Sequence, residues 1–210
     1  MTADSNIPNS ASELVASPIS NLILASASPR RLDLLGQIGV IPSGIIPADI
    51  DENPFDGEKP KAHAERLARE KAAKVAEDNS GTLILAADTV VACGHRILPK
   101  AEDKQSAFKC LTLLSGRRHK VITGISLVLP CGRQLVKSVT TTVIFKRLSE
   151  QNIKTYLASG EWHGKAGGYA IQGLAAGYIR SISGSYSNVV GLPLFEISGW
   201  LEAHMDQTQA

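Results

Sequence analysis

The chain has 210 residues, 43% of them hydrophobic, and a formal net charge of +2. This hydrophobic content excludes a disordered protein, and the small charge gives no basic field that would favour a nucleic-acid-binding protein. The three cysteines (Cys93, Cys110 and Cys131) form no Cys-x-x-Cys pair, which favours reduced thiols in a cytoplasmic protein. No apolar run approaches the roughly 20 residues of a membrane helix. We therefore expect neither a nucleic acid nor a membrane as a partner.

Residues 1–20 are rich in Ser, Ala, Asn and Pro, with neither Lys nor Arg. This composition is unlike that of a secretory or mitochondrial targeting segment. We predict a flexible extension over residues 1–20 and a single domain over residues 21–210.

A strand and a helix meet at a polar corner near the start of this domain. Leu22–Ala25 is apolar and predicts a buried strand, and Ser26-Ala27-Ser28 follows it. Ser28 suits an N-cap and Pro29 the first helical position, and Gly36 and Gly39 suit the helix end. A helix N-terminus that also carries Arg30 and Arg31 favours an anion. The alternative is a capped helix with solvated arginines, and this stretch alone leaves both open.

The next segments are a short strand, an acidic stretch and a long helix. Residues 45–48 predict an edge strand, and Asp49, Asp51 and Glu52 after it form either a cation site or an acidic surface loop. Residues 60–78 predict a helix with one apolar face, which places Arg66, Arg69 and Lys74 on the solvent side. Lys71 falls on the apolar side, where a lysine either extends to water or points into a site.

Residues 82–87 are apolar throughout and predict a central strand that leads into Asp88 and Thr89. Open α/β sheets place ligand chemistry at the carboxyl ends of such strands. Val90, Val91 and Cys93 continue the sheet, Gly94-His95 predicts a turn, and the return segment brings Lys100. A helix is predicted over residues 102–114, and the basic run 117–120 predicts a solvated loop.

The second half alternates strands with helices and contains a glycine-rich stretch. Strands are predicted over residues 121–129, 135–145 and 178–182, and helices over residues 149–159 and after Pro193. Between them, residues 164–173 are either a flexible connector or backbone that approaches a ligand closely. The order of elements predicts an α/β fold with a mixed central sheet, flanking helices and two lobes around a cleft.

Basic side chains on several elements, together with carboxylates, suit a polyphosphate and the metal that accompanies it. The chain has no Gly-x-x-x-x-Gly-Lys-[Ser/Thr] motif and no Gly-x-Ser-x-Gly motif, which disfavours a P-loop enzyme and an α/β-hydrolase. The residues alone thus predict an α/β protein that binds an anionic, phosphate-bearing ligand.

Several sequence blocks, in matching order from Leu22 to Leu194, resemble the signature of the Maf family. They are Ala25–Arg31, Leu67–Ala72, Ala87–Val91, Leu114–His119, Lys165–Gly173 and Val190–Pro193. The resemblance implies a Maf/ITPase-like fold with a nucleotide-binding cleft. It also implies a nucleoside triphosphate pyrophosphatase, which cleaves its substrate into a monophosphate and pyrophosphate.

The resemblance also assigns roles to residues of this chain. It implies that Asp88 is the general base and acts with a divalent cation, Mg²⁺ or Mn²⁺, and that Asp51 or Glu52 is a further metal ligand. Base choice in the family maps to Arg30, Thr89 and Gln172. The residues that the resemblance places on the phosphates are Ser26, Ser28, Arg30, Arg31, Lys71, Lys100 and Lys165.

Within the family, the loop from Lys165 to Gly173 resembles the branch that prefers dTTP and UTP. A glutamine amide such as that of Gln172 can pair with the edge that thymine and uracil share. Gly164, Ala101 and Ala170 depart from the family pattern, and the first leaves one polar contact unfilled.

Two alternatives stay open: a pyrophosphatase for 7-methyl-GTP or a broader set of nucleotides, and a non-catalytic nucleotide-binding regulator of septum formation. Asp88 favours the enzyme, because a carboxylate repels a polyphosphate unless a metal intervenes. The resemblance further suggests a homodimer.

Overall fold

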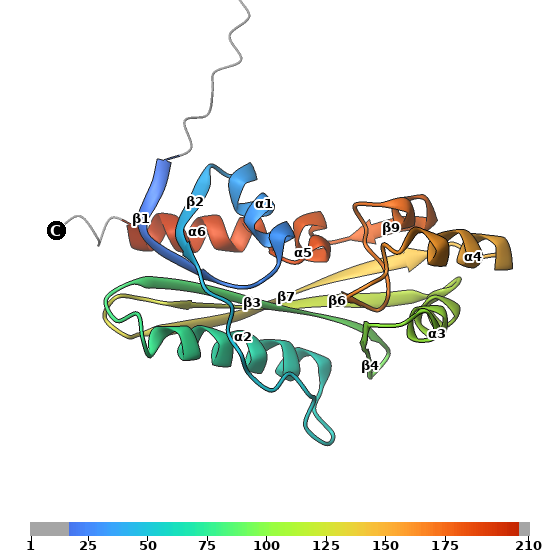
Figure 1. Ribbon diagram of the computed structural model, residues 1–210, viewed down its shortest axis with the longest axis horizontal. Coiled ribbons are helices and arrows are strands. Elements are labelled where there is room, and N and C mark those ends of the chain that lie inside the picture. Colours follow the sequence, from blue (N-terminus) through green and yellow to red (C-terminus); the bar gives the residue numbers. More distant parts are fainter. Residues whose placement is uncertain (1–16, 206–210) are drawn as a thin grey trace, which may run out of the picture.

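The computed structural model describes residues 17–205, which form a mixed sheet with helices on both faces (Figure 1). The predicted extension lies mostly outside the described residues, and the first strand begins at Ser17, five residues before its predicted start. The strands are β1 (Ser17–Ala25), β2 (Val40–Ile45), β3 (Leu83–Cys93), β4 (Arg96–Leu98), β5 (Lys100–Ala101), β6 (Arg118–Val128), β7 (Gln134–Phe145), β8 (Lys165–Ala166) and β9 (Ile179–Ser183). The helices are α1 (Pro29–Gln37), α2 (Pro60–Ala76), α3 (Lys104–Leu114), α4 (Glu150–Ser159), η1 (Leu174–Tyr178), α5 (Tyr186–Val190) and α6 (Leu194–Met205).

The main sheet has the order β2-β1-β3-β6-β7-β9, with β4 also paired to β3. β1 is parallel to β2 and β3, whereas β6, β7 and β9 add antiparallel pairs. This confirms the predicted mixed central sheet. In the described part of the chain, no helix is both long and apolar enough to cross a membrane.

The apolar runs of β1 and β3 are explained by helices on both faces of the sheet. Leu22 and Leu24 face the larger core with α1 and α6, whereas Ile23 and Ala25 face the smaller core between the sheet and α2. Side chains of a strand point alternately to opposite faces, so a strand covered on both sides must be apolar throughout. Each buried leucine contributes about 1.5–3 kcal/mol to this packing.

The close approach of α2 to the sheet depends on Gly124 of β6, which pairs with Asp88 of β3. A Cβ atom at Gly124 would lie 2.1 Å from the carbonyl oxygen of Ala64 in α2. Only glycine therefore permits the observed spacing between α2 and the sheet, which also sets the height of Lys71 above Asp88.

A gap beside β3 creates the space for a site. The pairing of β1 with β3 ends at Ala25 and Ala86, and β4 pairs with β3 only from Val91 onward. Asp88 and Thr89 lie between these two points, while β6 pairs with them on the other side. Asp88 thus lies in the middle of its strand, and it is the neighbouring parallel strand that ends there.

Two further predictions need correction. Residues 45–48 were expected to form an edge strand, but the edge strand is β2, which ends at Ile45. The basic run 117–120 was expected to be a solvated loop, but residues 118–120 open β6. His119 there is 1% exposed and packs edge-on against the rings of Phe145 and Tyr169. Paired strands can bury alternate residues of a polar run, which local composition does not reveal.

Candidate active site

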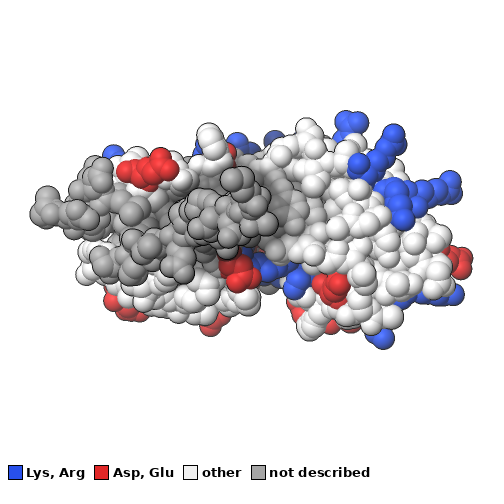
Figure 2. Space-filling view, turned by 90° about the horizontal axis from the view of Figure 1, so that it is seen from above, with Lys and Arg blue, Asp and Glu red and all other residues white. Residues whose placement is uncertain are grey.

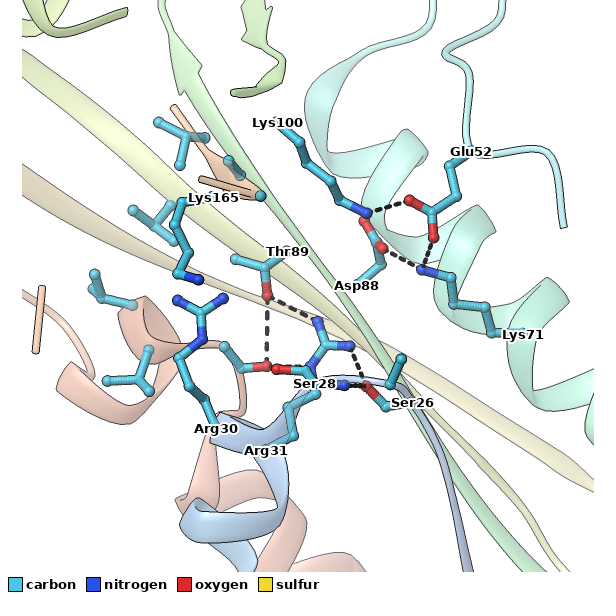
Figure 3. Close-up of a pocket in the computed structure, with 18 of the residues that line it drawn as sticks. Ser26, Ser28, Arg30, Arg31, Glu52, Lys71, Asp88, Thr89, Lys100 and Lys165 are labelled. Carbon is cyan, nitrogen blue, oxygen red and sulfur yellow. Dashed lines mark hydrogen bonds and ion pairs between the residues drawn. The ribbon is translucent and has the colours of Figure 1, made fainter. Parts of the chain in front are cut away.

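A cavity of about 210 Å³ opens where the gap beside β3 meets the N-terminus of α1 (Figure 3). Its walls come from the β1–α1 corner, the segment before α2, α2 itself, β3, β5, the glycine-rich loop and the end of α5. The predicted site residues that line it are Ser26, Ser28, Arg30, Arg31, Glu52, Lys71, Asp88, Thr89, Lys100 and Lys165.

Two predicted residues do not line this cavity, although Asp51 lines an adjoining one that shares Glu52 and Asp88 with it. Gln172 is exposed and lines a separate groove beside β9, so the structure does not bring its amide into this cavity. The carboxylate of Asp51 accepts hydrogen bonds from the backbone and side-chain nitrogens of Asn53, at 2.9 and 2.8 Å. Glu52, and not Asp51, is therefore the acidic residue of this segment that reaches Lys71 and the cavity.

The β1–α1 corner presents polar groups to the cavity. Ser28 occupies the N-cap position of α1, but its side chain accepts no hydrogen bond from the helix, and its backbone N–H donates to Ser26 Oγ at 3.2 Å. The Ser28 hydroxyl therefore stays available to an anion, whereas Pro29 has no N–H and the Arg31 N–H donates to the carbonyl oxygen of Ser28 at 3.1 Å.

Arg31 is held in place by one nearby group and by two groups from distant parts of the chain. Its Nε donates to the carbonyl oxygen of Gly191 at 2.9 Å, Nη1 to Ser26 Oγ at 3.0 Å and Nη2 to Thr89 Oγ1 at 3.4 Å. Burial lowers the pKa of Arg31, and the negative charge of Asp88 opposes this effect. The guanidinium is thus fixed at the edge of the cavity before any ligand binds.

A buried chain of hydroxyl groups supports Thr89. Thr123 Oγ1 lies 3.0 Å from Thr89 Oγ1 and donates to the carbonyl oxygen of Asn188 at 3.2 Å. Because the Thr123 proton is used in this way, Thr89 Oγ1 accepts from Arg31 and can donate its proton to Thr123 or to the carbonyl oxygen of Gly191 at 3.5 Å. The sequence patterns assign no role to Thr123 or to Gly191, although the Val190–Pro193 block contains Gly191.

Lys71 joins two carboxylates on one side of the cavity (Figure 3). Its Nζ lies 2.6 Å from both Glu52 Oε1 and Asp88 Oδ1, and Lys100 Nζ pairs with Glu52 Oε2. The buried, apolar face of α2 delivers Lys71, which shows that this lysine points into a site and not to water. Burial raises the pKa of Glu52, but its hydrogen bonds to Lys100 and Lys71 outweigh burial and lower the pKa to about 2.

Two more cations face the cavity from its other side. Lys165 belongs to β8, which pairs with β5 and so places Lys165 opposite Ala101, next to Lys100. Burial lowers the pKa of Lys165, and the nearby charge of Arg30 lowers it further. Basic and acidic side chains also lie together near the middle of the face shown in Figure 2.

The glycine-rich loop is pressed against the protein and is no flexible connector. Gly167 and Gly168 both have φ of +68°. A Cβ atom at Gly167 would lie 2.8 Å from a methyl carbon of Val91, and one at Gly168 would lie 3.2 Å from the Cα of Ala107. Tyr169 lines the cavity and its hydroxyl lies 2.8 Å from His119 Nε2. Backbone sterics therefore fix the wall that carries Lys165.

The donor set fits a divalent cation that binds together with phosphates. Glu52 and Asp88 both contact the Lys71 ammonium, so the two carboxylates lie close enough together to share a divalent cation beside it. Among residues 17–205, no group of three or more His, Cys, Asp or Glu side chains could hold a metal alone. Mg²⁺ is usually bound by one or two carboxylates, with substrate phosphates and water completing its shell.

Known proteins similar to this chain share one family. A sequence model of the family described as Maf-like protein matches residues 21–204. A dTTP/UTP pyrophosphatase of Paramagnetospirillum magneticum is 62% identical over 86% of this chain and 95% of its own length. A dTTP/UTP pyrophosphatase of Rhodospirillum rubrum is 59% identical over 86% of each chain.

A solved HAM1 protein of Coxiella burnetii is 19% identical over 60% of this chain and 73% of its own, with a TM-score of 0.41. At that TM-score and identity, the likeness supports no conclusion about the fold or the function of this chain. The family match spans nearly all the described residues and both relatives align over most of their length: the chain belongs to the Maf family.

Proposed function

We propose that this protein is a nucleoside triphosphate pyrophosphatase that hydrolyses dTTP and UTP, including modified pyrimidine nucleotides, as housecleaning of the nucleotide pool. The observation that carries the proposal is the composition of the cavity. Five basic side chains (Arg30, Arg31, Lys71, Lys100 and Lys165) surround two carboxylates, Glu52 and Asp88. The base preference is supported by relatives of about 60% identity that carry the name dTTP/UTP pyrophosphatase.

The basic residues bind and orient the triphosphate. The N-terminus of α1, with Ser26, Ser28 and Arg31, supplies donors at one end of the cavity, and Lys100 and Lys165 supply charge from the other walls. Because Arg31 is already fixed by Gly191, Ser26 and Thr89, little reorganisation accompanies binding.

Asp88 acts as the general base. It accepts a proton from a water molecule whose oxygen attacks a phosphorus atom of the α–β anhydride. The bond from that phosphorus to the bridging oxygen breaks, and the monophosphate and pyrophosphate separate. Lys71 fixes the Asp88 carboxylate through the 2.6 Å contact, so the base is held in one orientation.

We further propose that Glu52 and Asp88 hold a divalent cation, Mg²⁺ or Mn²⁺, when the nucleotide is bound. Such a cation neutralises charge that develops on the phosphate oxygens. The support is that both carboxylates contact the same ammonium, which places them close enough together to share a divalent cation beside it.

A cytoplasmic location and a homodimer belong to the same proposal. All three cysteines are unpaired thiols, which suits a reducing compartment. The homodimer rests on the family resemblance, and sedimentation of the purified protein tests it.

The test is pyrophosphate release from dTTP, UTP, CTP, GTP, ATP and 7-methyl-GTP, with Mg²⁺ or Mn²⁺. We expect turnover of dTTP and UTP, with roughly a 10²- to 10⁴-fold lower rate in Asp88→Asn. Asp33→Asn, which alters an exposed carboxylate of α1, serves as the control and should keep the wild-type rate. Turnover mainly of 7-methyl-GTP would overturn the base preference. Nucleotide binding without release of pyrophosphate would favour the non-catalytic regulator.

A further inference from the structure

Residues 46–59, between β2 and α2, form neither helix nor strand, yet they carry Glu52 into the cavity. Loops of this length without secondary structure are uncommon and need other contacts to hold one conformation. The contacts of Glu52 with Lys71 and Lys100 both lie within the cavity, where a bound nucleotide would compete for the same lysines. The segment therefore needs an anchor outside the cavity.

Arg66 of α2 supplies such an anchor. Its Nε and Nη2 donate to the two carboxylate oxygens of Glu58, at 2.7 and 2.9 Å. Nη2 also donates to the carbonyl oxygen of Asn53 at 3.0 Å, one residue after Glu52. A planar guanidinium can make these contacts together, because its donors form a rigid fork.

The surroundings of Arg66 close the anchor off from water. The guanidinium carbon lies 3.9 Å from the centre of the Phe55 ring, and Glu58 Oε2 accepts a hydrogen bond from the Phe55 N–H. His63 Nδ1 lies 2.8 Å from the same oxygen. As a result only 13% of the Arg66 side chain and 9% of the Glu58 side chain are exposed. The helical pattern had placed Arg66 on the solvent side of α2; the folded segment covers it.

A local turn also restrains the backbone at Glu52. Asp51 Oδ1 accepts hydrogen bonds from the backbone and side chain of Asn53, which folds the chain tightly around Glu52. Asn53 is thus held both by Asp51 and by Arg66. Glu52 lies inside the turn that joins Asp51 to Asn53, and Asn53 is bound to Arg66. The backbone of Glu52 is therefore restrained, and only its side chain keeps freedom to move.

We propose that Arg66, together with Glu58, is a positioning residue for Glu52. The anchor places the Glu52 carboxylate beside Asp88 and Lys71 without touching the substrate, so its effect on the reaction passes through Glu52. This inference rests on the proposed pyrophosphatase function and adds to it two residues outside the cavity.

A double-mutant cycle tests the proposal. Arg66→Met removes the guanidinium but keeps the apolar stem, and Arg69→Met is its control. Arg69 is exposed one turn along the same helix, and its side chain takes part in no hydrogen bond or ion pair within the described residues. We expect a roughly ten- to hundredfold lower kcat for dTTP in Arg66→Met and the wild-type kcat in Arg69→Met.

The second arm of the cycle places Arg66→Met in a Glu52→Gln background. If Arg66 acts through Glu52, its loss there should change kcat less than about twofold. An equal loss in both backgrounds would overturn the proposal, as would a wild-type kcat in Arg66→Met. If Arg66→Met does not fold, Arg66→Lys takes its place, because lysine keeps the positive charge but lacks the paired donors of the guanidinium. An equal loss of kcat in both backgrounds, or a wild-type kcat in Arg66→Lys, would then overturn the proposal.

Hydrogen exchange of residues 49–59 gives a measurement that does not depend on activity. We expect faster exchange there in the Arg66 variant than in Arg69→Met, with exchange in the sheet unchanged. Equal exchange in both variants would show that Arg66 does not order the segment. If the wild-type protein hydrolyses no nucleotide, the proposed function fails, and hydrogen exchange still decides whether Arg66 anchors Glu52.

Discussion

Replacing Lys71 by methionine removes the ammonium that separates Glu52 from Asp88 and leaves the apolar stem on α2. The side chains of Lys71 and Asp88 are 9% and 6% exposed, so the variant contains a buried carboxylate without its partner. Breaking a buried ion pair in this way costs about 3–5 kcal/mol. We expect about 3 kcal/mol, because Glu52 is 37% exposed and can turn toward water.

The loss should depend on pH in a defined direction. Lys71 helps to hold the pKa of Glu52 near 2, below the ordinary value of 4.5. A carboxyl with a lowered pKa stabilises the folded state above pH 4.5, and this contribution disappears as the pH falls toward 2. The stability difference between wild type and Lys71→Met should therefore be largest near pH 7 and smaller at pH 4.

Urea denaturation at pH 7 and pH 4 measures this difference, and thermal unfolding at pH 7 should show a midpoint roughly 6 to 12 °C lower. Lys74→Met is the control, because that lysine lies on the same helix in an exposed pair with Glu77, and we expect no measurable change. Equal stability of Lys71→Met and wild type at pH 7 would refute the reasoning.

Three further substitutions test the fold. Gly124→Ala should lower the free energy of unfolding by about 3 kcal/mol, because its Cβ would meet the backbone of Ala64; urea denaturation measures this loss, and Gly199→Ala, with open space around it, is the control. Burial lowers the pKa of His119 to about 4, so only the unfolded chain binds a proton between pH 6.5 and 4. The free energy of unfolding of the wild type should fall by about 3 kcal/mol from pH 6.5 to pH 4, and that of His119→Phe should fall less. Urea denaturation at pH 6.5 and pH 4 measures both, and an equal fall in the two proteins would contradict this prediction. Ser149→Ala removes the N-cap of α4 and should lower the free energy of unfolding by about 1 kcal/mol, which thermal unfolding measures. Ser159→Ala is the comparison, because Ser159 is exposed at the other end of the same helix and is not its N-cap.

Local patterns in the sequence determined most of the elements. The 3.6-residue repeat of residues 60–78 predicted α2, and Ser28-Pro29 predicted where α1 begins. The apolar run at residues 82–87 predicted a strand covered on both faces, which β3 is. These features depend on contacts within a few residues, so they can be read without knowledge of the fold.

The predicted cluster of site residues also came largely from the sequence, through several family blocks in matching order. Most of those residues meet in one cavity. The separation of Glu52 from Asp51 did not follow from the sequence, because two adjacent carboxylates have the same chemistry. It depends on which of them the backbone of residues 46–59 turns toward α2.

Only the tertiary structure decided which strand leaves the gap at Asp88, and it also decided that Arg66 is covered by the segment that carries Glu52. β1 and β3 are about sixty residues apart at their pairing, and Arg66 lies thirteen residues from Asn53. Such contacts depend on strand register and on the path of a segment without secondary structure, and no periodicity of the sequence encodes either. The sequence by itself therefore determined which groups this protein has for its chemistry, while long-range packing decided which of them face one another.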